Sequence, residues 1–382
     1  MDKIRRFFEC FVPITACNLR CDYCYVIQEK RKLGQVAGFT YSPEHIAMAL
    51  SKERLGGVCY FSICGAGETL MMPGLSEVVA ALLQEGHYVN ITTNGTFTSG
   101  FRKLLNIITT PAVCQGSPVA IPSAVTGTNP LSNHLHFAFS LHFLELERKG
   151  LLGRFAENVN SIRAAGCSFV IQMNLYDGYA ERLDEIKRYC MDNFGAYPQL
   201  AATRLELGNR IELHTRHTEK EYRDMGGTFN SPLFDFTMRN FNVRRHEFCY
   251  AGDWSACLEL TGGWMKKCYG DRKAVNIYDD IDKPIPFEAF GSHCRSLYCV
   301  NSSHFLSLGV IPELYRDVSY AGLRNREEAH WYNDEMREFL SGKLVETNSL
   351  YPVWRRMWID IKEPFRLYGT RLRNKIKRML KK

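Results

Sequence analysis

Short apolar runs alternate with amphipathic segments over the first half of the chain. The runs are rich in β-branched and aromatic residues and predict strands, whereas apolar positions repeated every three to four residues predict the helices between them. Ser42 and Pro43 begin one helix, because serine caps a helix N-terminus and proline fits its first turn, and Gly56 ends it. The predicted strands cover residues 7–15, 57–68, 87–95, 134–143, 167–178 and 199–208, and the predicted helices 41–57, 73–86, 99–110, 154–166 and 181–195.

These repeats predict an α/β fold with a parallel sheet, a partial (β/α)6 TIM-like barrel over residues 1–215. The chemistry of such barrels gathers at the carboxyl ends of the strands. Polar or glycine-rich residues stand at the ends of five predicted strands, as CNLRC, GAGE, TTNG, SLHF and NLYDG. The stretch 109–133, rich in Pro, Ser, Thr and Gly, precedes a strand, so we expect it at the opposite rim.

From about Arg216 the strand–helix rhythm stops. We expect a connector over 216–248, a small β-hairpin and loop domain over 249–310, a helical region over 311–364 and a tail over 365–382. The hairpin is predicted from ACLELTGGWMKKC, in which two alternating strands flank a Gly-Gly turn.

The composition is that of an ordinary folded protein, with 45% hydrophobic and 23% charged residues. No apolar run reaches membrane-spanning length, and the N-terminus lacks the apolar stretch of a signal peptide. The 14 cysteines therefore indicate metal ligands or catalytic groups in a reducing cytoplasm rather than a disulfide framework. The net charge of +7 comes from the tail, where eight Lys/Arg stand without Asp/Glu, and it predicts no nucleic-acid partner.

Cys17, Cys21 and Cys24 have C-x3-C-x2-C spacing in the loop after the first strand. A zinc site needs a fourth Cys or His at short range, and a thioredoxin-like motif uses only two cysteines. Three cysteines that hold a [4Fe–4S] cluster leave one iron without a protein ligand, and an open iron can bind a chelating small molecule.

Here the sequence resembles the radical S-adenosylmethionine (radical SAM) superfamily, whose signature is C-x3-C-x-φ-C with an aromatic φ, here Tyr23. GAGE, residues 65–68, is similar to the GGE motif of the family, with Ala66 as the one departure. TTNGT, residues 92–96, matches a common ending of the third strand in this family. The resemblance implies S-adenosylmethionine contacts from Tyr23, Gly65, Gly67, Glu68, Thr93, Asn94, Ser140 and Asn174.

The resemblance also implies the chemistry. A [4Fe–4S] cluster on the three cysteines chelates S-adenosylmethionine, and an electron from a flavodoxin- or ferredoxin-type donor cleaves it to methionine and a 5′-deoxyadenosyl radical. That radical removes a hydrogen atom from an unactivated C–H position. The site must then exclude water and oxygen.

A second cysteine group resembles the SPASM and twitch extensions of radical SAM enzymes. CYAGDWSACLELTGGWMKKC, residues 249–268, reads C-x13-G-x4-C, and CRSLYC follows at 294–299. Five cysteines stand where a full SPASM pattern has seven, so the twitch form with one auxiliary [4Fe–4S] cluster fits better. The implied ligands are Cys249, Cys268, Cys294 and Cys299, with zinc as the alternative, whereas Cys257 is expected to be a buried thiol in phase with the neighbouring leucines.

The remaining cysteines and histidines have no ligand spacing. Cys10, Cys59, Cys114, Cys167 and Cys190 are expected to be small buried residues or free thiols. Cys64 directly precedes GAGE, so a hydrogen-donating thiol is an alternative there. The histidines weighed as acid–base or outer-sphere groups are His142, His214, His217, His293 and His304.

In the tail, apolar positions recur at helical spacing among basic residues: Phe365, Tyr368, Leu372, Ile376 and Met379. This pattern predicts either a solvated helix or reversible contact with an anionic membrane at the inner face of the cell.

The substrate expected from the resemblance is a peptide or protein, modified by dehydrogenation, cross-linking or epimerisation. A saccharide or lipid-linked saccharide is the alternative. A non-catalytic Fe–S or zinc-binding module is the alternative of another class, which the GAGE and TTNG segments disfavour because such a module needs no pocket for S-adenosylmethionine.

Overall fold

The computed structural model describes residues 2–109, 130–206 and 211–362. Its main sheet has the strand order β11-β10-β9-β1-β2-β3-β4-β5-β6, and β1 to β6 run parallel. Consecutive parallel strands with helices between them confirm the predicted partial (β/α)6 arrangement, which ends at two edges instead of closing. The six strands are β1 (Arg6–Val12), β2 (Cys59–Gly65), β3 (Tyr88–Thr93), β4 (Leu135–Ser140), β5 (Ser168–Leu175) and β6 (Gln199–Ala202).

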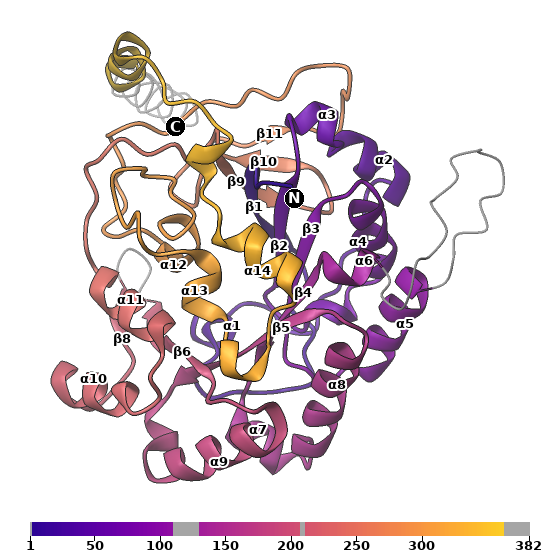
Figure 1. Cartoon of the computed structure of the whole chain (residues 1–382), viewed down its shortest axis with the longest axis vertical. Helices are drawn as coiled ribbons and strands as arrows, with labels where there is room; N and C mark the ends of the chain where they lie inside the picture. Colours follow the sequence, from indigo (N-terminus) through magenta and orange to yellow (C-terminus); the bar gives the residue numbers. More distant parts are fainter. Residues whose placement is uncertain (1, 110–129, 207–210, 363–382) are drawn as a thin grey trace, which may run out of the picture.

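Helices follow the outer side of these strands, and α4, α5 and α8 lie one after another along it (Figure 1). The helices of this half are α1 (Tyr25–Gln28), α2 (Pro43–Ala49), α3 (Lys52–Leu55), α4 (Leu75–Gln84), α5 (Thr98–Thr109), α6 (Pro130–Asn133), α7 (Phe143–Arg148), α8 (Leu152–Ala164) and α9 (Leu183–Phe194). Short 3-10 turns lie at η1 (Thr69–Met71) and η2 (Asp177–Arg182).

Side chains of the barrel strands alternate between an apolar outer face and a more polar inner face. On β4, Phe137 and Phe139 pack against Phe101 of α5, with ring centroids 5.5 and 5.6 Å apart. The alternate residues Ala138 and Ser140 line a cavity on the other face. Because the register of parallel strands aligns like faces, the inner sides of neighbouring strands meet in one interior.

Two predicted elements are interrupted. The helix expected over 41–57 is divided into α2 and α3, because Ser51 caps a second helix and its hydroxyl accepts the amide of Arg54 at 3.4 Å. Ser42 and Pro43 begin α2 as predicted, and Gly56 ends α3 in the left-handed conformation with φ of 75°. The strand expected over 199–208 ends with β6, after which β7 (Arg204–Glu206) pairs with β8 (Ile211–Leu213) in a separate sheet.

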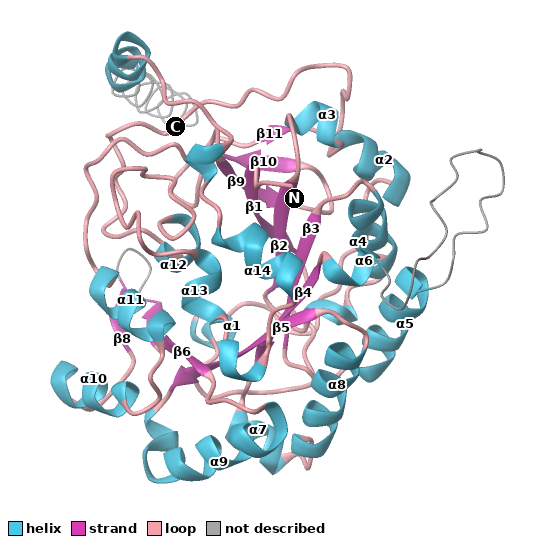
Figure 2. Cartoon of the chain, in the orientation of Figure 1, coloured by secondary structure: helices cyan, strands magenta, loops and turns pink. Residues whose placement is uncertain are grey.

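The predicted hairpin is present, but it belongs to the barrel sheet. β9 (Ser255–Glu259) and β10 (Trp264–Lys266) pair antiparallel around Gly263, and β11 (Val275–Asn276) pairs with β10. β9 also pairs parallel with β1, which joins the second cysteine region directly to the barrel. Loops predominate between β11 and α12 (Figure 2). The limits of the domains stay a prediction.

The C-terminal region returns to the barrel. Phe339 of α14 stacks on Tyr88 of β3, with ring centroids 3.7 Å apart. Residues 353–362 form a further helix. The other elements are α10 (Glu219–Gly227), α11 (Pro232–Asn240), α12 (Ser302–Phe305), α13 (Tyr320–Arg324), α14 (Asp334–Ser341), η3 (Glu327–Ala329) and η4 (Leu344–Glu346).

Among the described residues, no helix combines the length and the apolar character needed to cross a bilayer. The predicted tail over 365–382, Cys114 and most of the stretch 109–133 lie outside the described residues.

Candidate functional site

The three clustered cysteines line a cavity of about 520 Å³ at the carboxyl ends of β1 to β5, which we call the cysteine-loop cavity. The cavity also collects residues from the turns after four further strands. All eight residues predicted to contact S-adenosylmethionine line it, namely Tyr23, Gly65, Gly67, Glu68, Thr93, Asn94, Ser140 and Asn174. The strand ends thus converge on one cavity, as expected. That these eight residues bind S-adenosylmethionine stays a prediction.

The glycines of GAGE let the second strand end approach the cysteine loop. A Cβ atom on Gly67 would lie 2.1 Å from the carbonyl oxygen of Ala16, directly before Cys17. The Gly67 amide donates to Ile14 O at 2.7 Å, and the Glu68 amide donates to Ala16 O at 2.8 Å. No side chain fits at position 67 without moving the loop.

The carboxylate of Glu68 ties this turn to the next strand end. It accepts hydrogen bonds from the Thr93 hydroxyl at 2.6 Å, the Asn94 amide at 2.7 Å and the Leu70 amide at 3.1 Å. Burial raises the pKa of Glu68, against the opposing effect of these donors. The Glu68 side chain therefore holds the turns after β2 and β3 together at the rim of the cavity, and its hydrogen bond fixes the position of the Asn94 backbone.

Asn94 in turn contacts the cysteine loop. Its side-chain amide lies 3.6 Å from the sulfur of Cys17 and donates to Asn18 Oδ1 at 2.9 Å. The Leu19 amide also donates to the sulfur of Cys17, at 3.4 Å. Hydrogen bonds to a ligand sulfur are one of the means by which a protein sets the potential of an iron–sulfur centre.

Tyr23 anchors the loop from the opposite side. Its hydroxyl lies 2.7 Å from Nδ1 of His142 and 2.9 Å from the hydroxyl of Tyr179. Burial lowers the pKa of His142 to about 4, so this imidazole is neutral at pH 7. Glu145 also holds the loop, because it accepts the amide of Arg20 at 2.8 Å. The sequence did not point to Tyr179 or Glu145, which lie far from the cysteines along the chain.

The thiols of this loop fit an iron–sulfur cluster by their donor chemistry. Burial raises the pKa of Cys17 and of Cys21, and neighbouring cysteines raise them further. A bound cation reverses this effect, since coordinated cysteines are thiolates. Within the described ranges, no three His, Cys, Asp or Glu side chains come as close together as the ligands of a single metal ion.

The second cysteine group lies around the β9–β10 hairpin, which continues the sheet beyond β1. Burial is the main cause that raises the pKa of Cys249, Cys268 and Cys299. Cys294 lies near enough to all three thiols to raise their pKa further. Cys257 lies on β9 on the face opposite Leu258, so the expected phase with the leucines is wrong. Its thiol is buried, and it stands opposite Glu9 in the pairing of β9 with β1.

A second cavity of about 270 Å³, the inner cavity, lies inside the barrel next to the first. Both cavities are lined by Thr92, Ser140 and Asn174. The inner cavity also has Cys299 in its wall, so it reaches from the cysteine-loop side to the second cysteine group.

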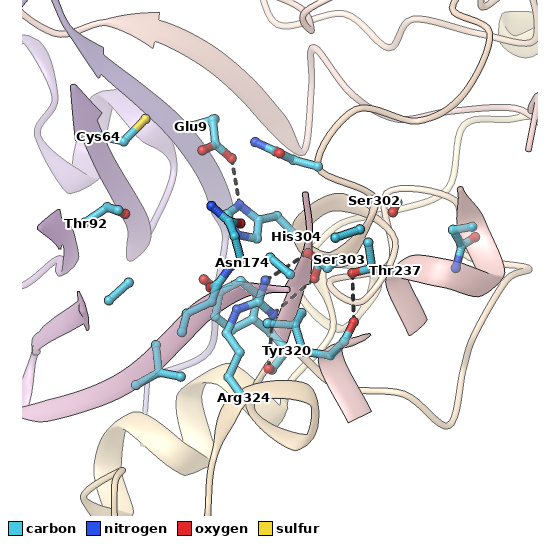
Figure 3. A pocket seen from close by; sticks show the side chains of 18 of the residues that line it. Glu9, Cys64, Thr92, Asn174, Thr237, Ser302, Ser303, His304, Tyr320 and Arg324 are labelled. Atoms are coloured by element: carbon cyan, nitrogen blue, oxygen red, sulfur yellow. Dashed lines mark hydrogen bonds and ion pairs between the residues drawn. The ribbon is translucent and has the colours of Figure 1, made fainter. Parts of the chain in front are cut away.

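Charged and polar side chains project into the inner cavity (Figure 3). Glu9 of β1 pairs with His304 of α12 at 2.8 Å, and Glu9 is 5% exposed. Arg324 of α13 is 2% exposed and donates to the carbonyl and hydroxyl oxygens of Ser303 at 3.2 Å. Asn90 is buried too, and its Oδ1 has no hydrogen-bond partner among the residues that the structure describes.

Sequence reasoning missed Glu9 and Arg324 and assigned His304 an outer-sphere role at the second cysteine group. A signal for Glu9 was present, because it is the one charged residue inside the apolar run 7–15. No comparable signal marked Arg324, which enters the cavity from a region with no strand–helix pattern. Cys64 does line the inner cavity, and burial raises its pKa to about 12, so it is a protonated thiol.

The other candidates are dispersed. Cys10, Cys59, Cys167 and Cys190 are buried, as expected. His214, His217 and His293 line neither the cysteine-loop cavity nor the inner cavity.

Comparison with known proteins gives one family match, to the Radical SAM superfamily over residues 11–115. No curated protein matches the sequence. The structure is similar to that of Streptococcus suis SuiB bound to S-adenosylmethionine, with 15% identity and a TM-score of 0.48, over 74% of this chain and 65% of that one. The chain thus spans slightly less than two thirds of SuiB.

Two further structures are similar at lower scores. One is anSMEcpe with bound AdoMet and Cp18Cys peptide, at 14% identity and a TM-score of 0.44, over 96% of this chain and 98% of that one. The other is BtrN in complex with AdoMet and 2-DOIA, at 13% identity and a TM-score of 0.32, over 91% and 92%. The family match covers the cysteine loop and the turns at residues 65–68 and 93–94, so this part of the chain matches the Radical SAM superfamily.

Proposed function

We propose that this radical SAM enzyme removes a hydrogen atom from a peptide or protein substrate, one residue of which enters the inner cavity. Cys17, Cys21 and Cys24 would hold a [4Fe–4S] cluster, which in its reduced form would supply the electron that splits S-adenosylmethionine into methionine and a 5′-deoxyadenosyl radical. Gly65 and Gly67 leave room for the backbone to approach the amino acid end of S-adenosylmethionine, and Ser140 and Asn174 contact its nucleoside.

The observation that carries the proposal is the shared wall of the two cavities. Thr92, Ser140 and Asn174 line both, so a radical formed in the cysteine-loop cavity faces whatever the inner cavity holds. At about 270 Å³ the inner cavity lies below the range of roughly 300–1,000 Å³ that is usual for sites of drug-sized ligands. A single side chain fits this size better than a larger folded segment.

The pair of Glu9 and His304 supports dehydrogenation as the outcome. Glu9 engages Nδ1 of His304, which leaves Nε2 as the atom that accepts a proton. Oxidation of an H–C–O–H unit to C=O then gives one hydrogen atom to the adenosyl radical, one proton to His304 and one electron to an acceptor. An iron–sulfur cluster on Cys249, Cys268, Cys294 and Cys299 would be that acceptor, and Cys299 lines the same cavity.

A saccharide is the second candidate. Neutral polar side chains suited to hydroxyl groups line the inner cavity in number, namely Asn90, Gln172, Asn174, Thr237 and Asn240. The buried Oδ1 of Asn90, which lacks a hydrogen-bond partner in the described part of the chain, would accept a hydrogen bond from a substrate hydroxyl.

The first test is anaerobic. The protein reconstituted with iron and sulfide is incubated with dithionite and S-adenosylmethionine, and 5′-deoxyadenosine is quantified. We expect its formation by the wild type and its loss in Cys24→Ala. Absence of 5′-deoxyadenosine from a wild-type protein that contains its cluster would refute the radical chemistry for this chain.

The second test identifies the substrate class. Cells of the producing organism are grown in deuterated medium, and their extract is offered to the enzyme with or without prior protease digestion and size fractionation. Deuterium in 5′-deoxyadenosine reports abstraction from an extract component. We expect protease digestion to abolish this transfer. If deuterium transfer persists after protease digestion but is lost after periodate treatment, the substrate is a saccharide and not a peptide.

A further inference from the structure

The helix over residues 353–362 turns its apolar side away from the protein. Val353 is 73% exposed, Trp354 69%, Met357 58%, Trp358 59% and Ile361 52%. These positions recur at the spacing of one face of a helix, so they form a continuous apolar surface with two tryptophans. We call it the tryptophan face.

The opposite side of the same helix attaches it to the protein through polar and cationic contacts. The carboxylate of Asp360 accepts the amide of Ser292 at 2.8 Å and its hydroxyl at 2.9 Å. Arg355 lies over the ring of Tyr351, 3.7 Å from its centroid, and Ile359 is buried. Lys362 forms an ion pair with Glu288 at 3.0 Å.

This arrangement is the reverse of an ordinary surface helix, which buries its apolar stripe and exposes its charges. The contacts of Asp360, Arg355 and Ile359 fix the rotation of the helix about its axis, so the tryptophans cannot turn inward without breaking them. Contiguous exposed apolar surface of this kind marks a site of interaction.

The charge of the following chain indicates the partner. Residues 365–382 carry eight Lys/Arg and no Asp/Glu, directly after the helix. Tryptophan is enriched where a protein meets the boundary between lipid headgroups and acyl chains, and clustered Lys/Arg beside such a segment are attracted to anionic lipids. A protein partner with an apolar groove would not require this run of like charges.

We propose that the tryptophan face docks on an anionic lipid bilayer, as a peripheral contact that needs no membrane-spanning segment. This inference goes beyond the proposed function and does not depend on it. It also places the predicted membrane contact on residues 353–362, with the basic segment 365–382 as its electrostatic complement.

The test uses the full-length protein with its clusters and vesicles either of phosphatidylcholine alone or of phosphatidylcholine mixed with phosphatidylglycerol. We expect co-sedimentation with the mixed vesicles, and quenching of tryptophan fluorescence by brominated lipid. The variant Trp354→Ser/Trp358→Ser should lower the bound fraction about ten-fold. The matched control is Met48→Ser/Met191→Ser, which removes apolar side chains that are 51% and 46% exposed on α2 and α9, and should bind as the wild type does.

Truncation after Lys362 separates the two contributions, because it removes the basic segment and keeps the tryptophan face. We expect the truncated protein to lose its preference for the mixed vesicles. The proposal is overturned if the wild type does not bind the mixed vesicles, if the double tryptophan variant binds equally, or if the control loses as much. A wild-type dimer in solution that the tryptophan variant converts to a monomer would assign the face to a second copy instead.

Discussion

Contacts of a few individual atoms set the geometry at the rim of the cysteine-loop cavity. Gly67 lies against the carbonyl of Ala16, and Glu68 distributes its two oxygens over three donors of the neighbouring turns. Both residues have a structural role that needs no bound cofactor. Gly67 sets the distance between the end of β2 and the cysteine loop, and the carboxylate of Glu68 ties the end of β2 to the end of β3.

Substitution Gly67→Ala should displace the loop, because the added methyl group meets a backbone oxygen at 2.1 Å. We expect a loss of stability of about 2 kcal/mol or more and a several-fold loss of iron incorporated on reconstitution. Thermal unfolding and iron analysis measure the two effects. The control is Ala66→Gly, one position away, which should change neither; equal iron content in Gly67→Ala and wild type would show that the close approach is dispensable.

Substitution Glu68→Gln should weaken the rim, because an amide cannot accept from all three donors as a carboxylate does. Hydrogen bonds to a charged group contribute about 1.5–3 kcal/mol each, so we expect unfolding at lower temperature and weaker binding of S-adenosylmethionine. Calorimetry and equilibrium binding provide the measurements. Glu157→Gln on the exposed side of α8 is the matched control, and a Glu68→Gln protein as stable as this control would contradict the role given to the carboxylate.

At the scale of elements, the β9–β10 hairpin decides how the two cysteine groups are placed. It extends the barrel sheet through β1, which brings Cys257 opposite Glu9 and puts the second cysteine group beside the inner cavity. The sequence predicted the hairpin from its alternation and its Gly-Gly turn. It did not predict the pairing with β1, because strand pairing depends on edge hydrogen bonds that leave no pattern in either segment.

Metal analysis tests the second cysteine group. Two [4Fe–4S] clusters give about eight irons per chain in the wild type, and Cys268→Ala should lower this to about four. Cys257→Ala is the control and should retain about eight, since Cys257 is not among the proposed ligands. About four irons in the wild type would exclude an auxiliary cluster, and one zinc ion in its place would assign the site to zinc. Cys249→Ala repeats the test if Cys268→Ala fails to fold.

At the scale of the whole molecule, buried histidines link stability to pH. Burial lowers the pKa of His87 to about 4, of His136 to about 3 and of His142 to about 4, against 6.5 in the unfolded chain. At a pH between the pKa of the folded chain and that of the unfolded chain, these histidines bind more protons in the unfolded chain than in the folded one. The free energy of unfolding therefore falls as the pH falls through this range. The contribution is fully present above about pH 6.5 and is lost toward pH 4.

Unfolding by urea at a series of pH values should therefore show a steep loss of stability between about pH 6.5 and 4. At about 1.4 kcal/mol per unit of pKa difference, His87 contributes of the order of 3 kcal/mol to this loss. His87→Gln should reduce the pH dependence, whereas His246→Gln at an exposed position should leave it unchanged. A pH profile that is identical in all three proteins would rule out this origin of acid sensitivity.

The sequence by itself determined the barrel, its order of elements and the cysteine loop, because hydrophobic periodicity and short-range spacing are local properties. It also located the turns at residues 65–68 and 93–94, which the structure brings to one cavity. The sequence-based prediction missed the break at Ser51, where a serine cap starts a second helix within one apolar pattern. It also placed Cys257 on the same strand face as the leucines, whereas consecutive residues of β9 point to opposite faces.

Only the tertiary structure decided the rest. The inner cavity joins Glu9 to His304, 295 positions later, and to Arg324 in the same C-terminal region, and no local pattern encodes such a meeting. The outward direction of Trp354 and Trp358 depends on contacts of the opposite side of the helix with other segments, those of Asp360 with Ser292 and of Lys362 with Glu288. Periodicity predicts that a helix has an apolar face, but only the packing of the folded chain determines whether that face is turned toward the core or toward the surroundings.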